Sequence, residues 1–256
     1  MPTIDTAVGR AFYAARGNAG PAILCIHGAG GSHSHWGHLL GGLDDIARVY
    51  AVDLPGHGRS DPPGHASIPG YAEFIFALMD ALELERAVLA GHSMGGAITL
   101  TAATERPSRV TGLILAGSSA RLRVLPSLIE GLVGDPEDAI DQMVGMLYAA
   151  DAPAELRAAG AAEYRRCDPL VFRDDFIACD GFDIRPRLAE LRLPALVITG
   201  TEDRMVPPKL SAELHAGLAG AQLASISGAG HMPMVERPDQ VVAAIREWLG
   251  AKMVPS

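Results

Sequence analysis

The chain reads AVLAGHSMGGAITL from Ala87 to Leu100, and this stretch decides how the rest of the sequence is interpreted. Its first four residues are apolar and predict a buried strand, whereas the residues from Gly96 to Glu105 predict a helix. The pentapeptide G-x-S-x-G, from Gly91 to Gly95, joins the two. A serine there projects its hydroxyl clear of the backbone only if the strand turns sharply into the helix, and the two glycines permit that close approach. Ser93 is therefore a candidate nucleophile.

A glycine-rich loop follows a second apolar run. The run Pro21 to Ile26 ends in His27-Gly28-Ala29-Gly30-Gly31. The helix after the serine begins with unpaired backbone N–H groups, and that of Met94 is the natural first donor to an oxyanion formed at the serine. A loop of glycines can bring a second N–H to face the first, and we expect that of Ala29 to do so.

Two further apolar runs end beside residues that complete a catalytic triad. The run Leu193 to Gly200 is followed by Asp203, and the run Ala221 to Ile226 is followed by His231 in a glycine-rich loop. A histidine can take the proton of a serine hydroxyl, and an aspartate can hold the imidazole in the required tautomer. We therefore expect Ser93, His231 and Asp203 to act together.

The chain resembles the α/β-hydrolase superfamily, in its carboxylesterase, enol-lactonase and C–C-bond hydrolase branch. The order Ser, Asp, His, each after a strand, is the order of that superfamily. Asp53 to Ser60 matches its D-x-P-G-x-G-x-S loop, Pro107 to Leu115 is similar to its sixth strand, and Gly228 to Pro238 is similar to its histidine loop. The resemblance covers essentially the whole chain.

The resemblance implies an α/β fold with a mostly parallel, twisted sheet and helices on both of its faces. We expect an N-terminal hairpin that turns near Val8-Gly9-Arg10. The expected strands are Ala22–Ile26, Ala47–Val52, Ala87–Ala90, Gly112–Ala116, Ala195–Thr199 and Leu223–Ile226, and the expected helices are Tyr71–Leu82, Gly95–Glu105, Pro208–Leu218 and Pro238–Trp248. Residues 1–118 and 187–256 would form the hydrolase core.

The strand pattern stops between residues 119 and 186, where helical stretches take over. The insertion resembles the cap that lies over the active site in members of the superfamily, and we expect its apolar side chains to contact the substrate. The residues expected to bind substrate are Leu125, Ile129, Met143, Met146, Leu147 and Phe172. Five arginines of the insertion are expected to be mostly solvated, because a guanidinium without a partner is costly to bury: Arg121, Arg123, Arg165, Arg166 and Arg173.

The composition excludes several classes of partner. The net charge of −9 argues against nucleic acid and against an anionic membrane surface, since both select basic faces. The sequence has no phosphate-binding glycine motif, and His33, His35 and His38 lack the spacing of metal ligands. We expect neither cofactor nor metal. The 3 cysteines, at no disulfide spacing, and the absence of a signal-like segment favour the cytoplasm.

These observations predict a carboxylesterase-like serine hydrolase that acts on small, mostly apolar, uncharged esters. Hydrolysis of enol-lactones or of C–C bonds in vinylogous diketones is the alternative reaction within the same branch. An alternative of another class is a ligand receptor that keeps the triad but turns over little. Glu202, one residue before Asp203, is the rival for the acidic position.

Overall fold

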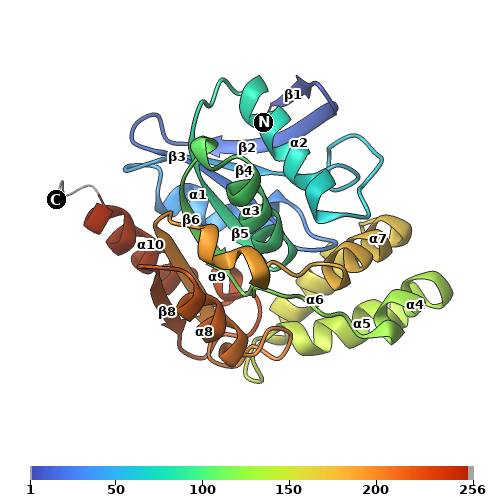
Figure 1. Cartoon of the computed structure of the whole chain (residues 1–256). Helices are drawn as coiled ribbons and strands as arrows, with labels where there is room; N and C mark the ends of the chain where they lie inside the picture. Colours follow the sequence, from blue (N-terminus) through green and yellow to red (C-terminus); the bar gives the residue numbers. More distant parts are fainter. Residues whose placement is uncertain (1, 253–256) are drawn as a thin grey trace.

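The structure is a computed structural model, and it describes residues 2–252. Its centre is a sheet of eight strands in the order β1-β2-β4-β3-β5-β6-β7-β8 (Figure 1). The first two strands are antiparallel to their neighbours, and all others run parallel. The strands are β1 (Thr3–Thr6), β2 (Gly9–Arg16), β3 (Ala22–Ile26), β4 (Arg48–Val52), β5 (Ala87–His92), β6 (Val110–Ala116), β7 (Ala195–Gly200) and β8 (Gln222–Ile226).

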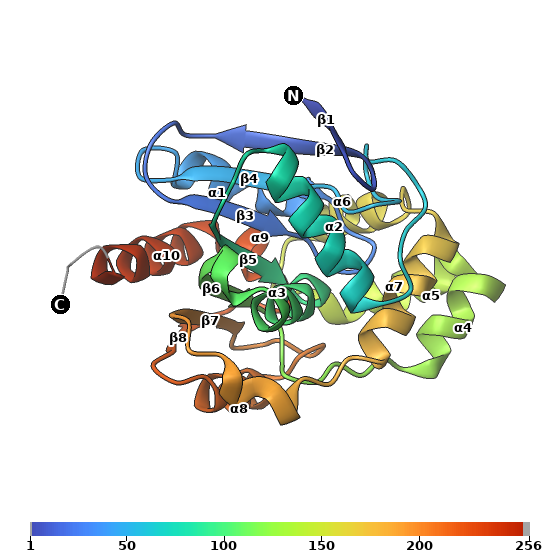
Figure 2. The ribbon, with the colours of Figure 1, turned by 45° about the horizontal axis from the view of Figure 1, so that its top comes forward.

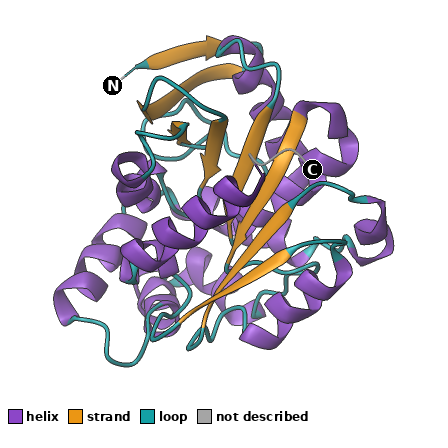
Figure 3. Cartoon of the chain, turned by 90° about the vertical axis from the view of Figure 1, so that its left-hand side faces the viewer, coloured by secondary structure: helices purple, strands orange, loops and turns teal. Residues whose placement is uncertain are grey.

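Helices cover both faces of the sheet, as the purple ribbons in Figure 3 show. One face packs against α2 (Ile68–Ala81), α3 (Met94–Glu105) and α8 (Pro208–Gly217), and the other against α1 (Gly37–Gly42) and α10 (Pro238–Lys252). Short helices η1 (His33–Trp36), η2 (Pro107–Arg109) and α9 (Pro233–Glu236) connect these elements. The parallel strands are apolar throughout because neighbouring residues point to opposite covered faces: in β3, Leu24 enters one hydrophobic cluster and Cys25 the other.

Four helices are inserted between β6 and β7. They are α4 (Pro126–Gly134), α5 (Pro136–Leu147), α6 (Ala154–Tyr164) and α7 (Pro169–Asp180), and Figure 2 shows them grouped at one end of the sheet. Arg121 and Asp183 form an isolated antiparallel bridge, so the two ends of the insertion lie side by side. The boundary expected at 186/187 lies inside the next short helix, η3 (Arg185–Glu190).

The α/β-hydrolase fold expected from the sequence is confirmed, and its strands and long helices differ from the expected bounds only at their ends. The hairpin turn lies earlier than expected, because Thr6 already pairs with Gly9. Helix α1 was not expected. It has only 6 residues, of which Gly37, Gly41 and Gly42 disfavour a helix, and its burial of Leu39 and Leu40 compensates for that propensity.

Candidate active site

Ser93 lies on a strained turn between β5 and α3. Its φ of +52° and ψ of −115° are rare for a residue with a side chain, and such a conformation costs on the order of 1–3 kcal/mol. The close approach of strand and helix requires the flanking glycines. A Cβ on Gly91 would lie 2.1 Å from the carbonyl oxygen of Gly95, and one on Gly95 would lie 2.2 Å from that of Ile26. The turn predicted from the pentapeptide is present.

Two hydrogen bonds fix the backbone of this turn. The N–H of Ser93 donates to the carbonyl of Ala116 at the end of β6 (2.9 Å), and the Ser118 hydroxyl donates to the Ser93 carbonyl (2.9 Å). The Ser93 side chain itself is half-buried, and its hydroxyl forms no hydrogen bond with any residue between 2 and 252. The backbone is therefore held while the hydroxyl stays free, which suits a group that must approach a substrate.

Asp203 and His231 form a buried pair at the ends of β7 and β8. The Nδ1 atom of His231 lies 2.9 Å from Oδ2 of Asp203. The other carboxylate oxygen, Oδ1, accepts the N–H groups of Met205 (2.9 Å) and Val206 (2.8 Å), which hold the carboxylate in place. Because Oδ2 can only accept, Nδ1 carries the proton and Nε2 is left as the basic nitrogen.

The structure brings Asp203, and not its rival Glu202, to the histidine. Glu202 is exposed, and its carboxylate accepts the N–H of Ala150 (3.1 Å) at the end of the insertion. The ring of His92, next to Ser93 in the sequence, lies 4.8 Å from the ring of His231. The three candidate triad residues therefore occupy the same edge of the sheet, where the parallel strands end.

Glu236 supports the histidine loop, and sequence reasoning missed it. The carboxylate is buried, and it accepts the N–H groups of Gly230 (2.9 Å), Met232 (3.2 Å) and Ala149 (2.8 Å). The first two flank His231, and the third belongs to the insertion. A glutamate beside proline and methionine in a buried short helix was the available signal, because a carboxylate in such surroundings requires several donors.

The loop after β3 is fixed so that one of its N–H groups stays free. The Nε2 atom of His27 accepts the N–H of Leu54 (3.0 Å), so Nδ1 carries a proton and donates to the Gly28 carbonyl (2.8 Å). Burial and the neighbouring His57 lower the pKa of His27 well below its usual value, in agreement with a neutral ring. The Gly31 N–H also donates to the Gly28 carbonyl (3.1 Å).

In a trans peptide the N–H points away from the carbonyl of the same unit, so the Ala29 N–H points to the other side of the loop from the Gly28 carbonyl. Among the described residues, neither this N–H nor that of Met94, the first residue of α3, has a hydrogen-bond acceptor. The loop lies beside the nucleophile candidate, because a Cβ on Gly28 would lie 3.2 Å from Cβ of Ser93. Both predicted donors are thus unpaired.

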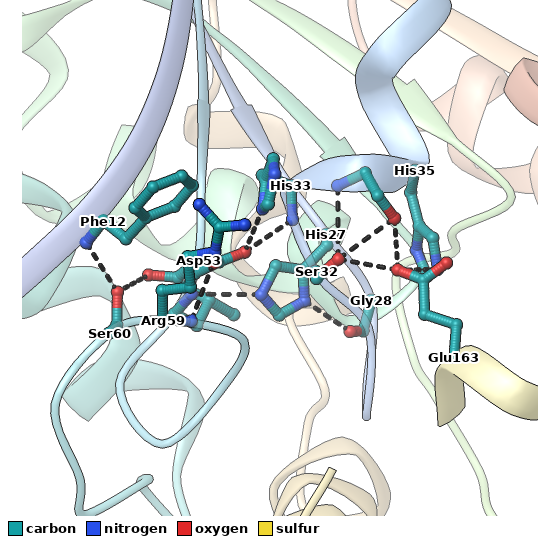
Figure 4. Close-up of polar contacts among 12 residues, drawn as sticks. Phe12, His27, Gly28, Ser32, His33, His35, Asp53, Arg59, Ser60 and Glu163 are labelled. Carbon is teal, nitrogen blue, oxygen red and sulfur yellow. Dashed lines mark hydrogen bonds and ion pairs between the residues drawn. The ribbon is translucent and has the colours of Figure 1, made fainter. Parts of the chain in front are cut away.

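The D-x-P-G-x-G-x-S loop, Asp53 to Ser60, holds the segment that begins at Ser32, directly after the glycine loop. Buried Asp53 accepts the backbone N–H (2.7 Å) and the imidazole (2.8 Å) of His33 and the N–H of Arg59 (3.0 Å), as Figure 4 shows. Burial alone would raise the pKa of Asp53, but the hydrogen bonds from His33 outweigh it and lower the pKa. The Ser60 hydroxyl donates to the Asp53 carbonyl (2.6 Å) and accepts the N–H of Phe12 (2.9 Å). This motif therefore has a structural role, because its hydrogen bonds fix the backbone at His33 and Phe12.

Helix α6 reaches the same segment through Glu163. Its carboxylate accepts the hydroxyl of Ser32 (2.6 Å) and that of Ser34, and it lies 3.6 Å from Nε2 of His35 (Figure 4). His33, His35 and His38 are thus divided between structural contacts and solvent. Within residues 2–252 no group of three His, Cys, Asp or Glu residues is arranged to hold a metal ion.

The residues expected to bind substrate lie at different depths. Phe172 is buried against the loop after β3, where a Cβ on Gly30 would lie 2.7 Å from its ring. Leu147 is buried, and its carbonyl accepts the N–H of His231 (2.6 Å). Met143 is buried inside the insertion, Ile129 and Met146 are half-buried, and Leu125 is 57% exposed at the start of α4. Phe172 therefore contacts the glycine loop through its ring, and Leu147 contacts the histidine loop through its backbone carbonyl.

Asp175 was also missed by sequence reasoning. It lies on α7 at a position that shares one helix face with Phe172, Phe176 and Cys179, all of which are buried. An aspartate at spacings of three and four residues from apolar side chains was the available signal, because it must be buried with them. Its carboxylate contacts the backbone of Gly30.

Comparisons with known proteins identify the family and its fold. The sequence model of the Alpha/beta hydrolase family matches residues 23–244. The enol-lactonase from Burkholderia xenovorans LB400 superposes with a TM-score of 0.91 at 25% identity, covering 97% of this chain and 100% of that one. An esterase from Thermogutta terrifontis has a TM-score of 0.90 at 26% identity and 99% coverage of both chains.

One relative found by sequence is named as an esterase. The pimeloyl-[acyl-carrier protein] methyl ester esterase of Neisseria meningitidis serogroup C is 27% identical over 245 residues, which are 89% of this chain and 93% of that protein.

None of the helices within residues 2–252 has the length and apolar character needed to span a membrane.

Proposed function

The chain belongs to the α/β hydrolase family, and we propose that it is a serine hydrolase that cleaves carboxylic esters of small, mostly apolar substrates through an acyl-enzyme. The observation that carries the proposal is the buried pair of His231 and Asp203 at the edge of the sheet where Ser93 is held in a left-handed turn. Nδ1 of the histidine is occupied by the aspartate, so its other nitrogen is the one available as a base.

The proposed reaction has two steps. As the Ser93 oxygen bonds to the ester carbonyl carbon, His231 takes the hydroxyl proton, and the carbonyl oxygen becomes an oxyanion that accepts the unpaired N–H groups of Ala29 and Met94. The C–O bond to the alcohol breaks, and His231 returns the proton to the leaving oxygen. Water then attacks the acyl-enzyme, again with His231 as base, and releases the acid and the free serine.

We infer that residues 119–186 act as a cap that shapes the acyl or alcohol pocket. The Phe172 ring packs on the glycine loop that carries the Ala29 N–H, and the Leu147 carbonyl accepts the N–H of His231. We infer that these two buried residues form an apolar wall of the insertion beside the reacting groups. An apolar wall stabilises apolar substrate groups by roughly 25 cal/mol per Å² buried. Enol-lactone hydrolysis is the second candidate, since a structural relative with 25% identity over nearly the full chain is an enol-lactonase.

A fluorophosphonate probe with intact-protein mass spectrometry tests the nucleophile, because the phosphorus bonds to an activated serine oxygen with loss of fluoride. We expect one added probe mass on the wild type and none on Ser93→Ala. Turnover of p-nitrophenyl acetate and butyrate by the same two proteins completes the test. Labelling elsewhere, or equal turnover by the variant, would contradict the assignment. Labelling at Ser93 without multiple turnover would favour the receptor alternative.

A further inference from the structure

The carboxylate of Asp175 joins four parts of the chain. Its Oδ2 accepts the N–H of Gly30 (2.8 Å) and lies 2.8 Å from Nε2 of His57, while Oδ1 accepts the hydroxyl of Tyr71 (2.5 Å). Asp175 and His57 are completely buried as side chains. Such a carboxylate is stable only when several donors surround it. Helix α7 is therefore bonded to the loop after β3, to the loop after β4 and to α2.

His57 neutralises the charge of this carboxylate. Its Nδ1 atom lies 3.0 Å from the carbonyl oxygen of Pro55, and its Nε2 atom faces Asp175. Both ring nitrogens thus face acceptors, so both carry protons and the ring is an imidazolium. The buried pair has no net charge, and it does not repel the negative charge that develops near the oxyanion loop during ester cleavage.

The Gly30 N–H belongs to the central peptide of a tight turn. Gly31 donates to the carbonyl of Gly28, and the third residue of the turn, Gly30, has a φ of +64°, as a type II turn requires. The central peptide of a turn can take two orientations, and the acceptor on Asp175 selects one of them. Phe172, one helical turn earlier on α7, presses on Gly30 from the same helix face.

We propose that Asp175, on the inserted helix α7, is a positioning residue that sets the oxyanion hole by holding the turn that carries the Ala29 N–H. The inference rests on the proposed serine hydrolase function and goes beyond it, because it makes the insertion part of the catalytic geometry. His27 holds the peptide before Ala29, and Asp175 holds the peptide after it. The Ala29 N–H belongs to the first of these peptides, and the second fixes the turn that follows it.

The expected effect on catalysis follows from the stabilisation of the transition state by the oxyanion hole. Removing a single oxyanion donor lowers kcat by roughly 10²–10³, and a displacement of about 1 Å can cost about 10². Loss of the Asp175 anchor displaces the donor without removing it. An asparagine oxygen could still accept the Gly30 N–H, so the variant that removes the anchor is Asp175→Leu, which has no acceptor. We expect Asp175→Leu to lower kcat by about 10- to 100-fold with little change in KM, because substrate binding in the ground state does not depend on the oxyanion contacts.

Tyr71→Phe is the matched control. It removes the third hydrogen bond of Asp175 but leaves the bond to Gly30 and the pair with His57. If Asp175 acted only by stabilising the fold, both variants would lower the melting temperature and neither would change kcat at a temperature where both are folded. We expect Tyr71→Phe to keep kcat within about twofold of the wild type.

Binding of a transition-state analogue separates positioning from a general loss of structure. A trifluoromethyl ketone forms a serine adduct whose oxyanion occupies the oxyanion hole, so its affinity for Asp175→Leu should fall by the same factor as kcat/KM. Loss of kcat without loss of analogue affinity would overturn the proposal. So would an Asp175→Leu variant with wild-type kcat, provided that the wild-type turnover depends on Ser93.

A measurement on the wild type keeps the proposal testable even if the variant does not fold. The backbone amide of Gly30 should exchange with solvent deuterium far more slowly than an unprotected amide, because it donates to a buried carboxylate. Fast exchange of this amide would contradict the hydrogen bond from Gly30 to Asp175 directly. Absence of any Ser93-dependent turnover contradicts the proposed function instead, and the role of Asp175 in catalysis falls with it.

Discussion

The imidazole Nδ1 of His231 and the carboxylate Oδ2 of Asp203 lie 2.9 Å apart, and both side chains are withdrawn from solvent. The neighbouring carboxylate of Glu202 instead bonds to Ala150 of the insertion. Two adjacent acidic residues therefore have separate tasks, one toward the candidate base and the other toward the insertion, and substitution can distinguish them.

We predict that Asp203→Asn lowers kcat by on the order of 10⁴, because the amide nitrogen would face Nδ1 and favour the wrong imidazole tautomer. Glu202→Gln is the control, and it should retain most of the activity. Steady-state hydrolysis of p-nitrophenyl butyrate by both variants, after their folding is checked by circular dichroism, makes the comparison. A mild effect of Asp203→Asn together with a severe effect of Glu202→Gln would exchange the two roles.

We predict that Glu236→Ala destabilises the protein by about 3 kcal/mol or more. Three backbone N–H groups would lose their acceptor, and each buried donor left unpaired costs about 1–3 kcal/mol unless water replaces the carboxylate. Glu247→Ala, at an exposed position of α10, is the control and should change stability by less than about 0.5 kcal/mol. Urea unfolding of both variants gives the two values, and similar values would contradict the assignment.

Sequence patterns predicted the parts of the site that depend on local structure. Ser93, Asp203 and His231 each follow a strand, and parallel strands bring their carboxyl ends to one edge, so order along the chain was enough to expect their proximity. The glycine loop and the turn at Ser93 carry local signals of the same kind.

The residues that brace the site could not be assigned in this way. Gly30 and Asp175 are 145 positions apart, and their contact depends on how α7 packs over the sheet, which no local pattern specifies. The signal of an acidic residue on an apolar helix face predicts a buried carboxylate but does not identify its donors. The same holds for His57, whose ion pair with that carboxylate no local pattern specifies.

We predict that the stability contributed by His57 decreases as the pH rises above about 6.5, the usual value for the unfolded chain. Burial alone would lower the pKa of His57, but the charge of Asp175 and the hydrogen bond to it raise the pKa well above that value. A histidine whose pKa is raised by folding stabilises the folded state. The stabilisation is complete at a pH below the pKa of the unfolded chain, and it is lost as the pH rises to the pKa of the folded protein.

Urea unfolding of the wild type and of His57→Gln between about pH 6 and 9 tests the direction of this pH dependence. The difference in unfolding free energy should shrink with pH by at most about 1.4 kcal/mol per unit. The other titratable groups that face His57, namely His27, Tyr71, Cys167 and Asp175, are the same in both proteins. A difference that grows with pH would mean that His57 is neutral in the folded state.

The insertion offers no free arginine in the wall formed by Phe172 and Leu147. Five of its seven arginines are paired with carboxylates: Arg121 and Arg185 with Asp183, Arg123 with Asp180, Arg165 with Glu137 and Asp141, and Arg173 with Asp174. Arg157 donates to the backbone carbonyls of Ala149, Ala150 and Ala152. The last, Arg166, is exposed and lines a surface pocket together with Gly30, Gly31 and Arg59. A substrate carboxylate would therefore enter an apolar wall without a charged partner, and this costs free energy.

We predict that kcat/KM for neutral short-chain and medium-chain esters exceeds that for a carboxylate-bearing enol-lactone of similar size by at least about tenfold, which corresponds to ~1.4 kcal/mol of transition-state binding. Arg166→Ala is the control for a charge effect of this exposed side chain, and it should change both values by less than about twofold, because exposed charges are screened by salt. A tenfold preference for the acidic lactone, lost in Arg166→Ala, would instead identify that arginine as the carboxylate ligand and enol-lactone hydrolysis as the reaction.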